Sequence, residues 1–125
     1  MTDPASSPAS ASVTRTVTAD DTARAVGSGD LEVLGTPVLL AWCEAATCQA
    51  LNLDPGQTSV GTRVEVAHLA ASPVGTEVMS TAVIEHLDDR RARFEVSAID
   101  AAGTVLARGV VERAIVDRER FLSHL

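Results

Sequence analysis

The chain has 125 residues, of which 46% are hydrophobic and 22% are charged, and it carries a net charge of −7. This balance is typical of a globular protein and excludes an intrinsically disordered chain, while the length suits one domain and hardly two. The acidic balance argues against nucleic-acid binding, because phosphates attract a basic surface.

The first residues carry no folding signal. Residues 1–11 are dominated by Pro, Ser and Ala, which predicts a disordered tail before a single domain at residues 12–125. The tail lacks the basic start and the apolar run of a signal peptide. Glu44 interrupts the longest apolar stretch before it reaches the ~20 residues of a membrane span. We therefore expect a cytoplasmic protein without membrane contact, and its all-Arg cations favour a GC-rich bacterial source.

A strand and a turn open the expected domain. Alternation at Val13 and Val17 predicts a strand, and Asp20 with Asp21 marks a turn. Ala23–Val26 is then expected to be a second, short extended piece.

The clearest element is a helix from Thr36 to about Leu51, in the segment GTPVLLAWCEAATCQAL. We expect Thr36 to be its N-cap and Pro37 to take the first helical position, where the missing N–H costs nothing. Nearly all its side chains are apolar, small or weakly polar, so other elements must surround it. Cys43 and Cys48 lie about 140° apart around the axis and are expected to be small buried thiols that do not pair.

The rest of the chain has the pattern of long strands joined by turns. The turn-forming segments NLDPGQ, PVGTE, DDRR and AAG precede or separate four strand-like stretches, which predicts an antiparallel meander. The first stretch is expected to carry on one face Val60, Thr62, Val64, Val66 and His68. A short helix is expected in DRERFLSHL. The predicted fold class is α+β, a strongly curved antiparallel sheet wrapped around one central helix.

Glu44 is the only charged residue in the long helix. Burial disfavours the charged form of a carboxylate, so such a group is either functional or held in a structural pair. Two interpretations stay open: a reactive carboxylate, or a carboxylate that reaches solvent or bonds an Arg of the sheet.

Two further residues are candidates for chemistry. His68 shares the inward face of its strand, and its imidazole suits proton transfer, although a satisfied core histidine is the alternative. Thr36 is explained by capping, yet the N–H groups of the helix N-terminus behind it are well placed to hold an oxyanion.

The spacing of these candidates points to a dimer. Thr36 precedes Glu44 by eight residues, which is about 12 Å along a helix axis and too far for one reacting carbonyl. A two-fold dimer would bring the N-terminus of one helix to the middle of the other and create two equal sites.

Three segments resemble the hot-dog-fold thioesterases, in particular the branch of the fluoroacetyl-CoA thioesterase. They are the helix VLGTPVLLAWCEAATCQAL, with a Thr eight residues before a Glu, the strand TSVGTRVEVAHLAASPVGTEV, with its S-x-G-T start, and the closing GVVERAIVDRERF. Together they fall within residues 30–121. The resemblance implies a hot-dog homodimer, with tetramers left open, that hydrolyses an acyl-CoA without a cofactor, CoA being part of the substrate.

The resemblance also assigns roles to residues. The implied catalytic set is Thr36, Glu44 and His68. Gly61 and Thr62, in the S-x-G-T segment, are expected to bind substrate, Gly61 through its backbone N–H. Arg113, in the E-R-A segment, would hold the site or bind substrate, and a solvated or ion-paired Arg is the alternative. Whether Glu44 attacks the thioester or activates water stays open.

The chain departs from the fluoroacetyl-CoA branch before and within the helix. The segment ARAVGSGDLEVL has no aromatic residue, Pro37 follows the shared Thr where that branch has Gly, and Trp42 precedes the Glu by two places. Selectivity for fluoroacetate therefore does not transfer, and a short or medium acyl-CoA is the expected substrate.

The sequence leaves two alternatives to hydrolysis open. One is a hot-dog dimer that binds an acyl-CoA or a small apolar ligand without turnover. The other is a hydratase of enoyl thioesters, whose strand motif is not evident. A solvated turn is the simplest reading of Arg90, Arg91 and Arg93, with contacts to the CoA phosphates as the alternative. The three histidines are scattered and imply no metal.

Overall fold

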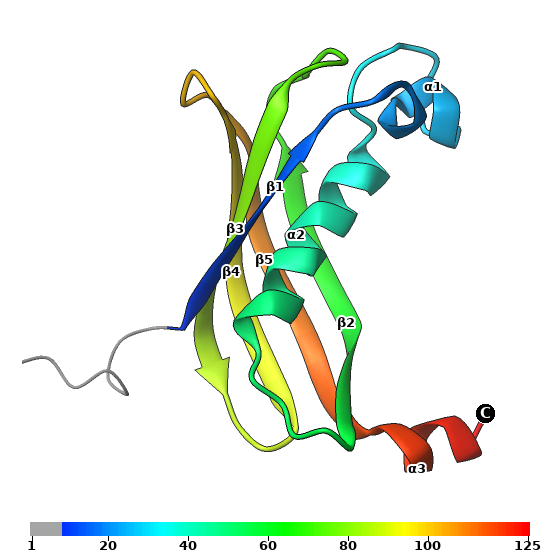
Figure 1. Ribbon diagram of the computed structural model, residues 1–125, viewed down its shortest axis with the longest axis vertical. Coiled ribbons are helices and arrows are strands. Elements are labelled where there is room, and N and C mark those ends of the chain that lie inside the picture. Colours follow the sequence, from blue (N-terminus) through cyan, green and yellow to red (C-terminus); the bar gives the residue numbers. More distant parts are fainter. Residues whose placement is uncertain (1–8) are drawn as a thin grey trace, which may run out of the picture.

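The computed structural model describes residues 9–125, and one long helix lies across a curved antiparallel sheet (Figure 1). The elements in chain order are β1 (Ser10–Thr16), the 3-10 turn η2 (Ala19–Asp21), α1 (Ala23–Val26), α2 (Thr36–Ala50), β2 (Gln57–His68), β3 (Glu77–Leu87), β4 (Arg91–Asp100), β5 (Val105–Asp117) and α3 (Arg118–Ser123). The predicted order of strand, helix and four strands is confirmed, as is the short closing helix.

The sheet has the strand order β1-β3-β4-β5-β2, and each neighbouring pair is antiparallel. Of the four strands predicted to form a meander, β3, β4 and β5 do so, whereas β2 pairs with β5 and not with β3, and β1 pairs with β3. The edge strands are therefore β1 and β2. The predicted α+β class, with a sheet curved around one helix, is confirmed.

Helix α2 packs mainly on β1 and β3 and makes fewer contacts with the other three strands. Its fully buried residues are Leu39, Cys43, Ala46 and Thr47. Ala41 and Cys48 are exposed. A helix surrounded on all sides is therefore a wrong expectation for the single chain, as is a buried Cys48, because the sheet covers only one side of α2.

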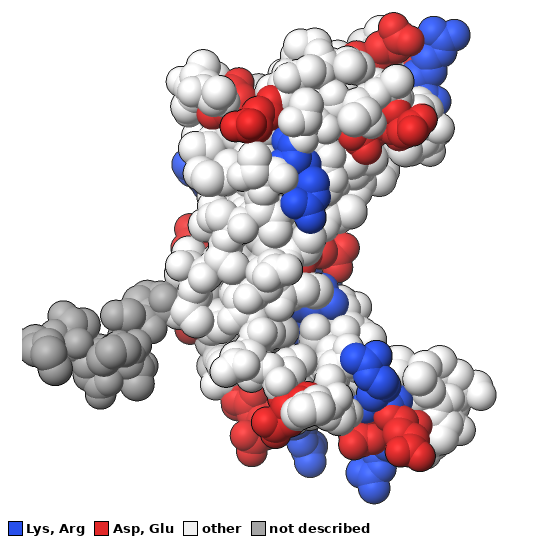
Figure 2. Space-filling view, in the orientation of Figure 1, with Lys and Arg blue, Asp and Glu red and all other residues white. Residues whose placement is uncertain are grey.

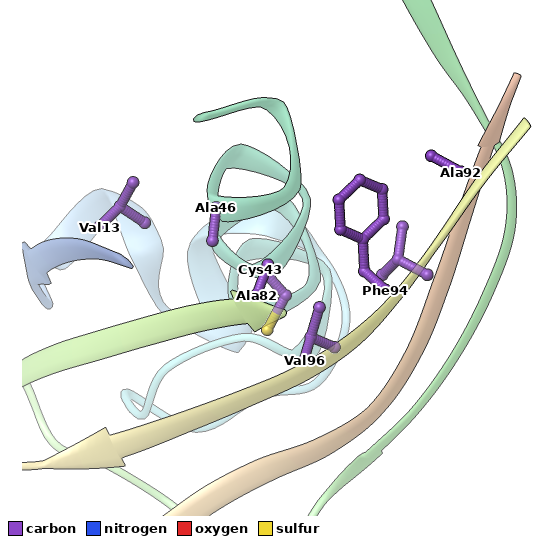
Figure 3. Packing of buried hydrophobic residues seen from close by; sticks show 8 residues of the cluster. Val13, Cys43, Ala46, Ala82, Ala92, Phe94 and Val96 are labelled. Atoms are coloured by element: carbon purple, nitrogen blue, oxygen red, sulfur yellow. The ribbon is translucent and has the colours of Figure 1, made fainter. Parts of the chain in front are cut away.

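The core between α2 and the sheet is built around one aromatic ring (Figure 3). Cys43 and Ala46 of the helix face Phe94 and Val96 of β4, and Val13 approaches from β1. Burying a Phe or Val side chain contributes about 1.5–3 kcal/mol. With so few aromatics, the remaining core volume is filled by Val, Leu and Ala.

The N-terminal part differs from the prediction in two places. Ala23–Val26 is a single helical turn, because the Thr22 side chain accepts a hydrogen bond from the Ala25 N–H and Gly27 ends the turn with φ 78°. Strand β1 begins at Ser10, two residues before the predicted domain start. Residues 1–8 of the predicted tail lie outside the described residues.

The start of α2 also differs by one residue. Gly35 is the N-cap, Thr36 is the first helical residue, and Pro37 is the second. Gly35 caps without a side chain, so the hydroxyl of Thr36 is free to bond elsewhere.

A β-bulge in β2 changes which residues face the helix. Gly61 pairs with Arg113 and Val64 pairs with Val111, so one residue, Thr62, is left over in β2. The extra residue moves the side chains after it to the opposite face. Val64, Val66 and His68 do share a face, as predicted, but with Gly61 and not with Val60 or Thr62.

Candidate active site

Thr36 and His68 meet at the N-terminal end of α2. Thr36 Oγ1 lies 2.7 Å from His68 Nδ1, with Thr36 in the first turn of the helix and His68 at the end of β2. Within residues 9–125, the other ring nitrogen, Nε2 of His68, is buried and has no hydrogen-bond partner. An imidazole anchored at one nitrogen and free at the other can exchange a proton with a bound ligand. We call this pair the histidine cluster.

The helix end beside this cluster offers fewer N–H groups than expected. Pro37 has none, and the N–H groups of Val38 and Leu39 both bond the carbonyl of Gly35. Among the described residues, this leaves Thr36 as the one donor of the first turn without a backbone partner. Any oxyanion contact at this end therefore depends on the Thr36 N–H.

Glu44 is paired with Arg113. Arg113 Nη1 donates to Glu44 Oε2 at 3.2 Å, and the exposed fractions of the two side chains are 8% for Arg113 and 36% for Glu44. Of the two interpretations of Glu44, the bond to an Arg of the sheet is thus realised. Arg113 is ion-paired and buried, not solvated. Because Glu44 keeps a third of its side-chain surface, its carboxylate remains accessible to a ligand.

Ser59 holds the guanidinium of Arg113 in place. Arg113 Nε donates to Ser59 Oγ at 2.9 Å, and Nη2 donates to the Ser59 carbonyl at 3.3 Å. Sequence reasoning did not single out Ser59. The available signal was its position two residues before Gly61 in the S-x-G-T segment, which places both on one face of the strand.

Gly61 lies directly against the carboxylate of Glu44. A Cβ added to Gly61 would be 2.6 Å from Glu44 Oε2 and 3.6 Å from Arg113 Nη1. The site therefore needs a residue without a side chain here. Ser59, Gly61, Glu44 and Arg113 together form what we call the carboxylate cluster.

Thr62 is not part of either cluster. Its hydroxyl donates to the Glu112 carbonyl at 3.2 Å, and its side chain is exposed at the bulge. The structure therefore separates Thr62 from Glu44, and its expected contact with substrate stays a prediction.

One chain keeps the two clusters apart. His68 lies seven positions after Gly61 in β2, and without the extra residue of the bulge the six regular steps correspond to about 20 Å at ~3.3 Å per residue. The three predicted catalytic residues are therefore not brought together within the single chain. Thr36 and His68 meet, while Glu44 lies with Arg113 toward the other end of β2.

Cys43 directly precedes Glu44 in the sequence, but its thiol is not reactive. Burial raises the pKa of the Cys43 thiol to about 11. A thiol with so high a pKa is neutral near pH 7 and a poor nucleophile. Both cysteines are unpaired, as predicted.

The face of the sheet opposite α2 has a hollow of about 400 Å³. It is lined in part by Thr62, Arg63, His86, Arg91, Arg93 and Glu112. Arg93 lies in β4 and not in the turn, and it is ion-paired with Glu85 at 3.1 Å and Glu112 at 3.0 Å, while its side chain stays 45% exposed. At the turn, hydrogen bonds from His86 and from the N–H groups of Arg90 and Arg91 lower the pKa of Asp88 to about 2.

The visible surface has no large patch of one charge. Figure 2 shows acidic and basic side chains interspersed and gathered toward the two ends of the molecule. Within residues 9–125, no three His, Cys, Asp or Glu side chains are grouped to hold a metal ion. None of the helices there has the length and apolarity to cross a bilayer.

Comparison with known proteins points to one family. Residues 17–119 match the family model described as fluoroacetyl-CoA-specific thioesterase (FlK). The chain is also 36% identical over 92 residues to the fluoroacetyl-CoA thioesterase of Streptantibioticus cattleyicolor. The aligned region is 72% of this chain and 66% of that enzyme, just under two thirds of the relative's length.

Solved structures give the same result for the fold. The structure of the fluoroacetyl-CoA thioesterase FlK superposes with a TM-score of 0.85 and 29% identity, covering 92% of this chain and 90% of the other. A thioesterase superfamily member of Thermus thermophilus superposes with a TM-score of 0.87 over 98% of this chain and 92% of its own, at 24% identity. The predicted hot-dog fold is thereby confirmed.

Proposed function

The chain belongs to the fluoroacetyl-CoA-specific thioesterase family, and we propose that it is a thioesterase that hydrolyses a short or medium acyl-CoA to the free acid and CoA. The observation that carries the proposal is the pair of clusters. A proton-transfer imidazole and an accessible carboxylate both occur on the helix-facing side of β2. Single-residue variants of the fluoroacetyl-CoA thioesterase have been solved with acetyl-CoA and with fluoroacetate and CoA, which supports an acyl-CoA as the substrate class.

The active unit is a homodimer formed through β2. This strand is an edge of the sheet, and among the described residues its outer side has no partner strand. Val64, in its middle, is 38% exposed although it is apolar. An exposed, apolar strand edge favours pairing with a second copy.

A two-fold axis near Val64 and Glu65 completes the site. It lies midway along β2 between Gly61 and His68, so antiparallel pairing of the two β2 strands sets His68 of one subunit opposite the bulge of the other. The histidine cluster of one subunit then meets the partner's carboxylate cluster. Two such sites result, and each needs both subunits.

In the proposed mechanism the thioester carbonyl lies between the two clusters. Glu44 either attacks the carbonyl carbon, so that the C–S bond breaks and an anhydride forms for water to open, or removes a proton from the attacking water. His68 donates the proton that leaves with the CoA sulfur. Thr36 orients the ring through Nδ1 and offers its N–H to the developing oxyanion. Incorporation of label from ¹⁸O-water into Glu44 in a single turnover would establish the anhydride route, because water that Glu44 only activates leaves its oxygen in the released acid.

Subunit complementation tests the shared site. Glu44→Gln and His68→Ala homodimers should each lose about 10²–10⁴-fold in kcat. A mixed dimer holds one site with His68 from the first variant and Glu44 from the second, both intact. Unfolding and refolding an equal mixture should therefore restore about a quarter of wild-type activity. No recovery in dimers proven to be mixed by mass spectrometry would contradict the shared site.

The Arg113 contact keeps one alternative function open. Because Glu44 already has an ionic partner, the same dimer could bind an acyl-CoA without cleaving it. A panel of acyl-CoAs with a thiol reagent decides between the two. Release of CoA supports hydrolysis, whereas a thermal shift without any release supports binding alone.

The proposed reaction needs no cofactor beyond the CoA that is part of the substrate. We also propose that the protein is cytoplasmic. Free thiols at Cys43 and Cys48 suit a reducing compartment. Selectivity for the fluorinated acyl group is not part of the proposal, because the segment before α2 lacks aromatic residues. Comparing hydrolysis of acetyl-, fluoroacetyl-, butyryl- and hexanoyl-CoA tests this substrate class.

A further inference from the structure

Arg113 donates three hydrogen bonds, and two of them go to Ser59. A guanidinium has five N–H donors in a rigid plane. One N–H bonds Ser59 Oγ, one bonds the Ser59 carbonyl, and one bonds Glu44. Because the two Ser59 contacts use different nitrogens, they fix both the position and the tilt of the plane. The Arg113 residue as a whole, backbone included, is 7% exposed, so water cannot readily replace these contacts.

The two oxygens of Glu44 have different surroundings. Oε2 accepts from Arg113 and lies against Gly61. Oε1 makes no hydrogen bond within the described residues, and the side chain keeps 36% of its surface. The plane of Arg113 therefore sets the direction in which Oε1 points.

We propose that Ser59 is a positioning residue, which acts through Arg113 to hold Glu44 Oε2 so that Oε1 is the oxygen presented to the thioester or to water. This inference rests on the proposed hydrolysis. It gives Ser59 no contact with substrate. Ser59 keeps the flexible carboxylate of Glu44 in one orientation, and correct orientation of a reacting group contributes strongly to the rate of an enzymatic reaction.

The inference predicts a loss of turnover without a loss of binding. In Ser59→Ala the Nε contact of Arg113 disappears, while the carbonyl contact remains. The guanidinium can then tilt, and a misplacement of the carboxylate near 1 Å costs about 10²-fold at most. We expect kcat to fall about tenfold with KM within about twofold, because the oriented carboxylate is needed in the transition state.

Two variants separate this role from a structural one. Thr58→Ala removes a hydroxyl from the adjacent residue, which faces the other side of β2, and should leave kcat at the wild-type value. Ser59→Thr keeps a hydroxyl at the same position, and its kcat should therefore stay close to the wild-type value. Melting temperatures of all three variants show whether any loss of rate merely follows a loss of stability.

A thermodynamic cycle tests the route through Arg113. Lys cannot reproduce the fork that bonds Ser59 and Glu44 together. Once Arg113→Lys has lowered kcat, adding Ser59→Ala should therefore change kcat by less than about twofold. Exchange of the Arg113 Nε–H, observed by NMR in ¹⁵N-arginine-labelled protein and assigned by its loss in Arg113→Lys, should be faster in Ser59→Ala than in the wild type.

The outcomes distinguish this inference from the proposed function. If the wild type hydrolyses acyl-CoAs and Glu44→Gln does not, but Ser59→Ala turns over like Thr58→Ala, the positioning role is overturned and the hydrolysis stands. If both losses in the cycle simply multiply, Ser59 does not act through Arg113. A wild type that releases no CoA from any acyl-CoA overturns both.

Discussion

Replacing Gly61 with Ala should disable the site without unfolding the protein. The new methyl carbon would lie 2.6 Å from Glu44 Oε2, and an ordinary contact begins at 3.4 Å. The carboxylate must therefore retreat by about 0.8 Å, and since it is the end of a flexible side chain, it can do so. A shift of this size in a reacting group costs about 10²-fold in rate. Gly61 is not one of the glycines with positive φ, so the backbone accepts Ala without strain.

Steady-state hydrolysis and thermal unfolding measured on the same preparation check this prediction. We expect kcat of Gly61→Ala to fall by about 10²-fold, with the free energy of unfolding within about 1 kcal/mol of wild type. Gly56→Ala is the matched control, because a Cβ there meets nothing within 4 Å. It should keep full activity. If Gly61→Ala turned over as fast as Gly56→Ala, the exact placement of Glu44 would be irrelevant to the reaction, and the reasoning would fail.

Three further predictions concern the interface, the core and the outer face. Val64→Asp should give a monomer by light scattering and abolish hydrolysis, because it places a charge in the proposed β2 contact; an active monomer would rule out the shared site. Burial raises the pKa of Cys43 from 9.0 to about 11, so the unfolded chain ionises first and stability should fall between those two pH values, by up to about 3 kcal/mol. Denaturant titrations should show this slope in the wild type and a flatter one in Cys43→Ala, and equal slopes would contradict it. Arg91→Ala should leave KM for acyl-CoA within about twofold, and a severalfold rise at constant kcat would instead assign Arg91 to the CoA phosphates.

The order and type of the main elements could be predicted because strong local signals mark them. Long stretches of β-branched residues between turn segments define the meander, and Gly35 with Pro37 marks the start of α2. The turn at Ala23–Val26 could not be assigned, because four residues are too few for a periodic pattern and tertiary contacts decide their conformation. The exposure of Cys48 could not be predicted either, because it depends on how much of the surface of α2 the sheet covers.

Most residues of the two clusters could be predicted from the sequence, but only part of their geometry. A lone charge in an apolar helix indicated Glu44, and strand alternation placed His68 on the inner face. Their partners, Arg113 for one and Thr36 for the other, follow from which strands become neighbours. That information is non-local, so no spacing within the chain reveals it. Ser59 was missed because a hydroxyl that serves another side chain has no pattern of its own.

The bulge at Thr62 lets β2 carry one residue more than its partner strand without turning either half of the strand over. Deleting Thr62 would leave Arg63 alone opposite Glu112, and regular alternation would then keep Gly61 and His68 on the helix-facing side. Insertions and deletions are ordinarily absorbed by loops, yet here the interior of a strand can absorb one. In any set of related sequences, a gap aligned between Gly61 and Arg63 would therefore mark a protein with a regular β2 strand in which both clusters still face the helix.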